Sequence, residues 1–284
     1  MNRRIWMVLL TLGIWSSAQA QSATTGIPAG PTNWPTDKLG TGNVTGNYIN
    51  VPPEYMVSTL KNHCAKGVVL FAAWPRRFMT TNGQNVGIFS VSLANALADR
   101  YASYFTQSVA EQYAACFGGF VYMDDMACPA CWGGQKVTAA QVADVAAHTK
   151  QKMPWAILGL RAEPTWIAQS ATLARNLDFG WAQYVTWKGG VSTYYNREFA
   201  KARLLGIKLA ASVNIFHCHG NDSPPCTAAE WRTYGSAALS QSENCAFVNW
   251  RYDATWWNRS DIRAVWTDLS RMAQTHVARS CKRS

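Results

Sequence analysis

The sequence predicts an α/β fold, namely a (β/α)8 barrel of the TIM type, irregular in places and stapled by disulfides. Segments typical of strands alternate strictly with segments of helical spacing. The strand segments include continuous apolar runs such as residues 67–74, which are typical of buried parallel strands. No Gly-rich phosphate loop follows the first strand, which disfavours a nucleotide-binding doubly wound sheet. About 264 residues follow a predicted signal peptide, a length that suits one barrel.

Residues 1–20 have the pattern of a secretory signal peptide. A positive start with Arg3 and Arg4 precedes an apolar run that ends at Trp15, and small residues flank a cleavage site after Ala20. The apolar run is too short for a membrane span, which needs about 20 residues. We therefore expect a monomeric protein that is secreted or periplasmic and has no stable membrane insertion.

The rest of the chain divides into a leader and one barrel domain. Residues 21–42 are rich in Gly, Pro, Thr and Ser, so we expect an irregular leader that wraps the surface. The barrel domain covers residues 43–284, without an internal repeat or linker. Strands are predicted over residues 44–50, 67–74, 119–125, 155–161, 179–187, 207–216 and 246–252. Helices are predicted over residues 53–64, 90–116 (with a break), 138–152, 164–175, 192–205, 227–243 and 260–276.

Seven predicted strands are one fewer than a complete barrel requires. Either one strand is not visible in the pattern, or the barrel is a variant. Pro53 at the start of one predicted helix and Gly206 after the end of another agree with the usual helix start and stop signals.

All eight cysteines follow the signal peptide, and an even number in an exported chain indicates disulfides. The sequence does not fix which cysteines pair. The Cys-Pro-Ala-Cys segment lies in a predicted loop rather than at a helix start, so we expect a structural bridge there and not a redox centre. The pairs that we expect are Cys128–Cys131, Cys218–Cys226, Cys64–Cys116 and Cys245–Cys281.

The charge of the chain does not predict a nucleic-acid partner. Without Arg3 and Arg4, 24 basic residues stand against 16 acidic ones, a net charge of +8. The basic residues are scattered, whereas a nucleic-acid site would need a stripe of Lys and Arg. Because few cofactor-dependent reactions run outside the cell, we expect no cofactor.

Strand ends carry the predicted binding site, because the active site of such a barrel lies at the C-terminal ends of its strands. Carboxylates, aromatics, amides and Arg gather there. This mixture suits carbohydrate, since sugar rings stack on Trp and Tyr while their hydroxyls bond to polar side chains. The residues expected to bind the sugar are Asp124, Tyr48, Trp74, Arg161, Gln183, Trp187, Asn214, Trp250 and Tyr252.

Hydrolysis of a glycosidic bond requires two carboxyl groups. Asp124 and Asp125 cannot form this pair alone, because adjacent strand residues point to opposite faces. We expect Asp125 to be the acid and Glu163 or Asp253 to be its partner. A carboxyl in an aromatic-lined mouth has its pKa raised by desolvation, as an acid catalyst needs. The structural alternatives are a loop cap for Asp124 and a salt bridge for Asp253.

Five short motifs resemble an uncharacterised group of secreted bacterial barrels that are similar to glycoside hydrolases. They are Val-Tyr-Met-Asp-Asp (121–125), Leu-Arg-Ala-Glu-Pro-Thr-Trp-Ile (160–167), Trp-Ala-Gln-Tyr (181–184), Val-Asn-Ile-Phe (213–216) and Val-Asn-Trp-Arg-Tyr-Asp (248–253). In that group the third-strand end resembles Asp-Glu-Pro, as on the acid/base strand of many barrel glycosidases. Here Asp125 stands where that Glu would be and is one methylene shorter. The departure leaves a non-catalytic carbohydrate-binding barrel as an alternative.

A metal-dependent hydrolase is a further alternative, since His217 and His219 flank one residue at a predicted strand end. The remaining histidines, His63, His148 and His276, fall on predicted helices. A closed metal site therefore lacks ligands, and we expect no metal.

Overall fold

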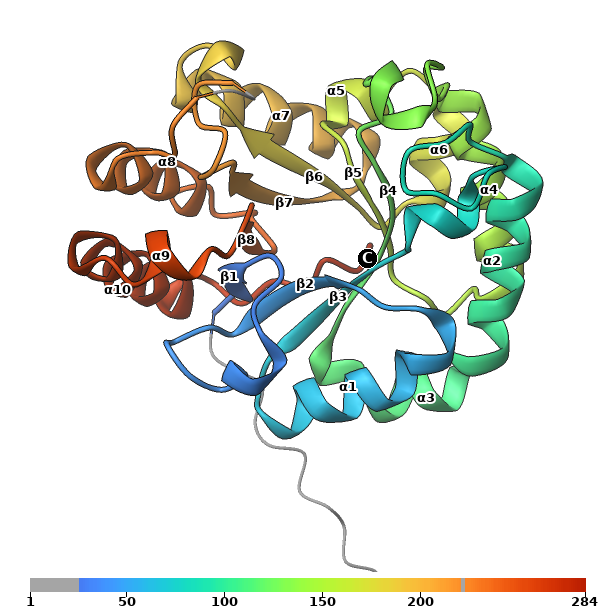
Figure 1. The fold of residues 1–284 in the computed structure, drawn as a ribbon, viewed down its shortest axis with the longest axis horizontal. Helices are drawn as coiled ribbons and strands as arrows, with labels where there is room; N and C mark the ends of the chain where they lie inside the picture. The colour runs from blue at the N-terminus through green and yellow to red at the C-terminus, as the bar shows by residue number, and fades with distance from the viewer. Residues whose placement is uncertain (1–25, 221–222) are drawn as a thin grey trace, which may run out of the picture.

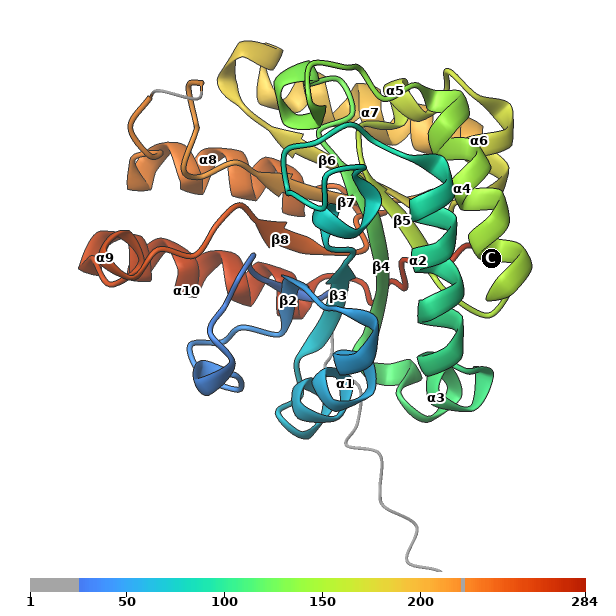
Figure 2. The same ribbon diagram turned by 45° about the vertical axis from the view of Figure 1, so that its right-hand side comes forward.

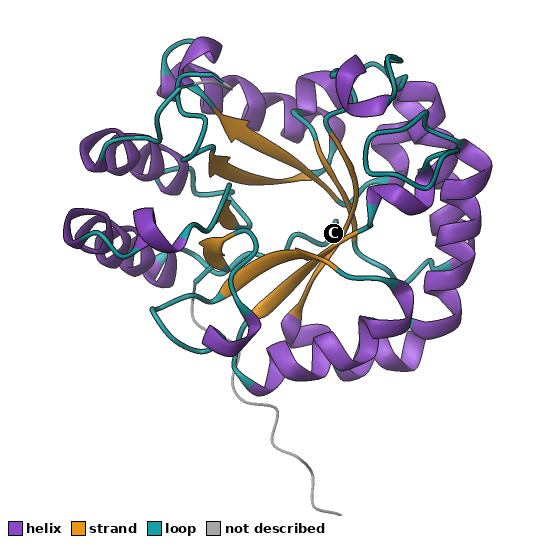
Figure 3. Ribbon diagram, in the orientation of Figure 1, coloured by secondary structure: helices purple, strands orange, loops and turns teal. Residues whose placement is uncertain are grey.

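The computed structural model describes residues 26–220 and 223–284, which form a ring of parallel strands with helices around it (Figure 1). The predicted signal peptide, residues 1–20, lies outside the described residues. Strands occupy the centre and helices the periphery (Figure 3). Within the described ranges, no helix has both the length and the apolar character needed to span a membrane.

The described chain contains eight strands and ten α-helices, and at least one α-helix follows each strand from β2 to β8. The strands are β1 (Ala29–Pro31), β2 (Gly46–Asn50), β3 (Val69–Ala73), β4 (Phe117–Asp124), β5 (Leu158–Arg161), β6 (Phe179–Tyr184), β7 (Lys208–Val213) and β8 (Phe247–Asn249). The helices are α1 (Met56–Ala65), α2 (Val91–Tyr104), α3 (Gln107–Gln112), α4 (Ala139–Lys152), α5 (Pro164–Ile167), α6 (Ala171–Asn176), α7 (Val191–Leu205), α8 (Ala228–Leu239), α9 (Ala254–Trp257) and α10 (Ser260–Thr275).

The strands close into a barrel through two kinds of contact. β2 to β7 form one parallel sheet in chain order, and β1 pairs in parallel with β8. Parallel bridges between Thr32 and Tyr48 and between Asn214 and Trp250 join the two sheets at their edges. The predicted (β/α)8 barrel is therefore confirmed. On both sides of the β1–β8 pair, the neighbouring strands are joined by isolated bridges instead of a regular ladder of paired residues.

β1 is the strand that the sequence pattern does not reveal, and it corrects the predicted leader. Ala29–Pro31 is buried between β8 and β2, although the sequence predicts an irregular segment on the surface there. A Cβ on Gly30 would lie 2.0 Å from the carbonyl oxygen of Gly46, so only glycine permits this approach. A run of Ala-Gly-Pro carries none of the large apolar residues that mark a strand. A short 3-10 helix, η1 (Thr36–Lys38), then leads to β2 in place of an α-helix.

Capping residues explain several helix boundaries. Thr138 and Thr227 each open a helix with a capping box, to Gln141 and Glu230 respectively. The long predicted helix over residues 90–116 is two helices, α2 and α3, separated at a buried Phe105. Residues 164–175 likewise divide into α5 and α6. Helices α2 and α4 lie side by side on the outside of the barrel (Figure 2).

The inside of the barrel is filled by side chains and is not a pore. Tyr48, Phe71, Phe179 and Trp181 pack there edge to face, with ring centroids 5.2 to 6.0 Å apart. The indole of Trp181 donates to Ser212 Oγ at 2.7 Å. Any ligand site must therefore lie above this layer, at one end of the barrel.

Four disulfides join the described cysteines in the pairs expected from the sequence. They are Cys64–Cys116, Cys128–Cys131, Cys218–Cys226 and Cys245–Cys281. The last one fixes the C-terminal tail at the N-terminal end of the barrel. There the backbone N–H of Arg283 donates to Asp178 at 3.1 Å, and Lys150 binds the same carboxylate at 2.6 Å.

Candidate functional site

Two adjoining cavities lie at the C-terminal ends of the strands. We call them the outer cleft, of about 570 Å³, and the inner pocket, of about 220 Å³. Asp125, Arg161 and Trp250 line both cavities, so the two form one site. The outer cleft is lined by Asp125, Met126, Ala127, Cys128, Cys131, Arg161, Ala162, Glu163, Trp166, Trp181, Gln183, Trp187, Lys188, Asn214, His217 and Trp250. The inner pocket is lined by Asn33, Tyr48, Asn50, Trp74, Arg76, Met79, Asn85, Val121, Tyr122, Met123, Asp124, Asp125, Arg161 and Trp250.

A cluster of two aspartates and two arginines occupies the centre of this site. Arg76, after β3, binds Asp124 at 2.5 Å and Asp125 at 3.1 Å. Arg161, at the end of β5, lies 3.3 Å from the second oxygen of Asp124. Burial raises the pKa of Asp124, but the two guanidinium groups outweigh it, and the net pKa is lowered. Asp124 therefore stays ionised and anchors both arginines.

The turn after β4 brings Asp125 to the same arginine as Asp124. Strand alternation predicts that the two side chains point to opposite faces, but the strand ends at Asp124 and Asp125 has a left-handed φ of 54°. Its carbonyl oxygen accepts from Trp132 Nε1 at 3.1 Å and from the Cys128 N–H at 2.9 Å. These bonds hold the turn, and the Asp125 side chain remains 45% exposed in the cavity.

Glu163 lines the outer cleft at the start of α5. Its carboxylate is paired with the ammonium of Lys188 and accepts from the Tyr194 hydroxyl at 3.1 Å. Lys188 also donates to the Gln183 carbonyl at 2.7 Å, which ties the segment after β6 to the cleft. Asp125 and Glu163 therefore line one cleft, each beside a cation.

Asp253 and Tyr252 do not line either cavity, contrary to the prediction from the sequence. Asp253 caps α9 and accepts from the Trp256 N–H at 2.9 Å. The Tyr252 hydroxyl bonds to Lys38 at 2.8 Å. The physical reason is that β8 ends at Asn249, so the chain has left the barrel mouth before it reaches these residues.

The other predicted site residues lie on the two cavities. Trp74 and Tyr48 are buried in the inner pocket, and burial raises the pKa of Tyr48 well above its ordinary value. Gln183, Asn214 and Trp187 line the outer cleft. Trp187 is 71% exposed, which is unusual for so large an apolar side chain.

Several residues of the site had no predicted role. Arg76, one of the arginines that follow a predicted strand end, binds both aspartates, and Trp166, Trp181 and Lys188 line the outer cleft. Lys188 directly follows the predicted Trp187, so proximity in the sequence was a usable signal. Trp181 lies inside a strand, and no local pattern distinguishes it from a core residue.

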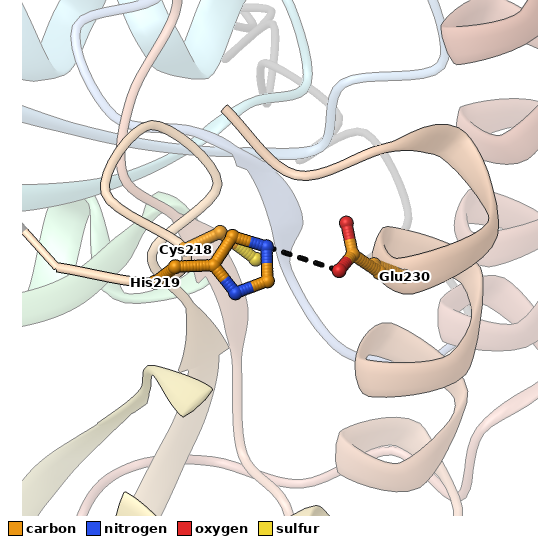
Figure 4. Close-up of side chains that lie close together, drawn as sticks. All are labelled: Cys218, His219 and Glu230. Atoms are coloured by element: carbon orange, nitrogen blue, oxygen red, sulfur yellow. Dashed lines mark ion pairs between the residues drawn. The ribbon is translucent and has the colours of Figure 1, made fainter. Parts of the chain in front are cut away.

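The structure separates the two histidines of the proposed metal site. His217 lines the outer cleft, whereas His219 lies 3.0 Å from Glu230 (Figure 4) and 3.2 Å from the Thr186 hydroxyl. Cys218 lies close to His219 and Glu230, but its sulfur is bonded to Cys226 and cannot serve as a thiolate ligand. Hydrogen bonds from Thr227 and the charge of His219 lower the pKa of Glu230, as a helix cap and ion pair would. A metal centre on His217 and His219 is thus not supported.

Solved structures with a similar fold include glycoside hydrolases. An exo-β-1,4-mannosidase from Opitutaceae bacterium strain TAV5 has a TM-score of 0.59 and 11% identity over 89% of this chain and 62% of its own. The present chain thus spans about 62% of the mannosidase's length. A β-mannanase from Thermomonospora fusca has a TM-score of 0.54 and 12% identity over 90% of this chain and 92% of its own. A GH18 chitinase from Pseudoalteromonas aurantia has a TM-score of 0.52 and 12% identity over 84% of this chain and 99% of its own.

No family model matches the chain, and no curated protein sequence does either. Identities this low establish a similarity of fold and nothing finer. The chain has a TIM-barrel fold similar to that of these glycoside hydrolases, and its activity has to be argued from the site.

Proposed function

We propose that this chain is an exported carbohydrate-active barrel that binds a poly- or oligosaccharide in the outer cleft and hydrolyses its glycosidic bonds. One observation carries the proposal. The cleft at the C-terminal mouth of the barrel is lined by two acidic residues, Asp125 and Glu163, and by four tryptophans. Those tryptophans are Trp166, Trp181, Trp187 and Trp250.

The aromatic side chains support binding of sugar rings. A pyranose presents C–H groups on its faces, which pack on the flat surface of an indole. The exposed ring of Trp187 and the half-buried ring of Trp166 are available for this on the outer cleft. Gln183, Asn214 and Lys188 add donors and acceptors for hydroxyls along the same cleft.

The carboxylates have different proposed roles. Asp124 is held ionised by two guanidinium groups, so it is unsuited to donate a proton and acts as an anchor. Asp125 is more exposed and is our general acid. Glu163 is its partner, as base or nucleophile, and Lys188 offsets its negative charge.

Four disulfides support the export part of the proposal, because such bonds persist in oxidising compartments outside the cytoplasm. Residues 1–20 have the pattern of a signal for that export.

The test is a screen of the mature protein on a panel of polysaccharides that includes mannan, cellulose and chitin, with release of reducing ends as the readout. We expect turnover on at least one, and a loss of about 100-fold or more in Asp125→Asn. Asp144→Asn on the exposed side of α4 makes the same chemical change away from the site and should keep full turnover. Turnover that Asp125→Asn leaves unchanged would refute the assignment.

A non-catalytic carbohydrate-binding barrel is the second candidate. The observation that favours it is that each candidate carboxylate is already paired with a cation, Asp125 with Arg76 and Glu163 with Lys188. Binding of a polysaccharide that Trp187→Ala weakens, with no release of reducing ends by the wild type, would establish this alternative.

A further inference from the structure

We propose that the inner pocket receives one uncharged sugar ring, the terminal unit of a chain whose next units lie in the outer cleft. The protein then recognises the end of a saccharide chain rather than its middle. This inference rests on the proposed function and assigns the smaller cavity a role in substrate selection.

The loop after β3 contributes Met79 and Asn85 to the lining of the inner pocket, and it packs on the loop after β4. The loop after β3 folds back as a short hairpin, in which Thr80 and Phe89 form an antiparallel bridge. Phe89 packs edge to face on Trp132 of the loop after β4, with ring centroids 5.5 Å apart. A Cβ on Gly133 would lie 2.9 Å from the backbone nitrogen of Ile88, so the two loops are in direct contact. The inner pocket, at about 220 Å³, is less than half the size of the outer cleft, so we infer that a saccharide chain entering from the outer cleft ends there.

A buried donor in the pocket lacks a partner. Trp74 is 3% exposed and lines the pocket, and its Nε1 has no hydrogen-bond partner among the described residues. Its ring is held in place by stacking on Tyr101 at 5.0 Å. Leaving a buried donor unpaired costs about 1–3 kcal/mol, so an acceptor oxygen from a ligand would be favoured there. A sugar hydroxyl or ring oxygen supplies such an acceptor.

A second donor stands at the junction with the outer cleft. Arg161 Nη1 lies 3.3 Å from Asp124 in an ion pair that is not aligned as a hydrogen bond. Arg161 lines both cavities, so its guanidinium lies at the junction where two successive sugar units would meet.

The charges of the pocket favour an uncharged ring. Two cations, Arg76 and Arg161, are matched by two anions, Asp124 and Asp125. The two carboxylates would repel an anionic sugar. The two guanidinium groups that could attract it are already paired with those carboxylates. The pocket is also lined by three neutral amides, Asn33, Asn50 and Asn85, which can bond to hydroxyls.

The experiment follows the indole N–H signals of the mature protein by ¹H–¹⁵N NMR during titration with glucose, mannose, galactose and N-acetylglucosamine, with glucuronate as the charged comparison. Trp74→Phe and Trp231→Phe assign two signals. Trp231 is the internal control, because its Nε1 is also buried and unpartnered within the described chain but lies on α8, outside the barrel. We expect at least one neutral sugar to shift the Trp74 signal, glucuronate to leave it unmoved, and Trp231 to stay unchanged.

A second variant tests the proposal even if Trp74→Phe does not fold. Asn85 is exposed on the hairpin loop, so Asn85→Trp fills the pocket without touching the core. We expect it to abolish the sugar-dependent shift of the Trp74 signal. A Trp74 signal that no neutral sugar moves, or that moves equally in Asn85→Trp, overturns the inference. If turnover still depends on Asp125 in that case, the proposed function stands and only the chain-end recognition fails.

Discussion

The guanidinium carbon of Arg161 lies 4.8 Å from the ring centre of Trp250. Arg161 ends β5 and Trp250 follows β8, so this contact spans the mouth of the barrel at the boundary of the inner pocket and the outer cleft. Stacking on an aromatic face fixes the plane of a guanidinium. The contact thus holds Arg161 in position over Asp124.

Arg161→Lys should separate charge from geometry at this contact. Lysine keeps the positive charge but cannot stack as a plane or present a fork of donors. We expect turnover to fall about tenfold and the free energy of unfolding to fall by about 1 kcal/mol. Arg77→Lys is the matched control, because Arg77 is exposed and stacks on Phe78 outside both cavities. Equal effects of the two substitutions on turnover would contradict the role given to Arg161.

The lowered pKa of Asp124 predicts a specific acid sensitivity. Because its folded-state pKa lies below the unfolded value of about 3.9, Asp124 adds stability that is complete above that value and is lost as the pH falls through the folded pKa. Urea unfolding between pH 3 and 6 should show a steeper loss below about pH 4 in the wild type than in Asp124→Asn. Identical slopes would show that Asp124 carries no such linkage.

The barrel and most residues of its mouth were predictable, because both depend on local patterns. Buried parallel strands are continuous apolar runs, and polar residues at their ends must gather at one end of the barrel. This reasoning brings Asp125, Glu163, Gln183, Asn214 and Trp250 to the outer cleft, where the structure has them.

The predictions that were wrong concern β1, Asp253 and Asp125. Their positions depend on strand pairing, strand ends and backbone turns that a local sequence pattern does not reveal. β1 is held by pairing with β8, a contact over more than 200 residues of sequence, and its own residues carry no strand signal. Asp253 is placed by the early end of β8 and by the capping of α9. Asp125 joins Asp124 at Arg76 only because the chain turns with a positive φ.

The disulfide of the C-terminal tail should be the more stabilising of two that can be compared directly. Cys245 and Cys281 are separated by 36 residues, and Cys128 and Cys131 by 3. Loop-closure entropy gives losses of about 4 kcal/mol for Cys245→Ser/Cys281→Ser and about 2 kcal/mol for Cys128→Ser/Cys131→Ser. Denaturant unfolding measures both, and the opposite order would show that chain entropy does not dominate here.

Besides the Cys245–Cys281 disulfide, we expect Asp178 to stabilise the fold at the N-terminal end of the barrel. It is 6% exposed, and its carboxylate accepts from Lys150 at 2.6 Å and from the Leu158 N–H at 2.8 Å. Asp178→Ala leaves the Lys150 charge without its partner, so we expect a loss of about 3–5 kcal/mol in the free energy of unfolding. Asp144→Ala, on the exposed side of the same helix as Lys150, should change it by less than about 0.5 kcal/mol. Equal losses would remove this role of Asp178.

The most direct measurement compares Asp125→Asn, Glu163→Gln and the double variant on the polysaccharide that the screen identifies. Two groups that act on one bond in one cleft lose catalysis as a unit. We therefore predict that each single variant loses about 100-fold or more in kcat/KM, and that the double variant loses little more than the worse single one. Single losses that multiply in the double variant, or a Glu163→Gln variant with wild-type kcat/KM, would contradict a catalytic pair of Asp125 and Glu163.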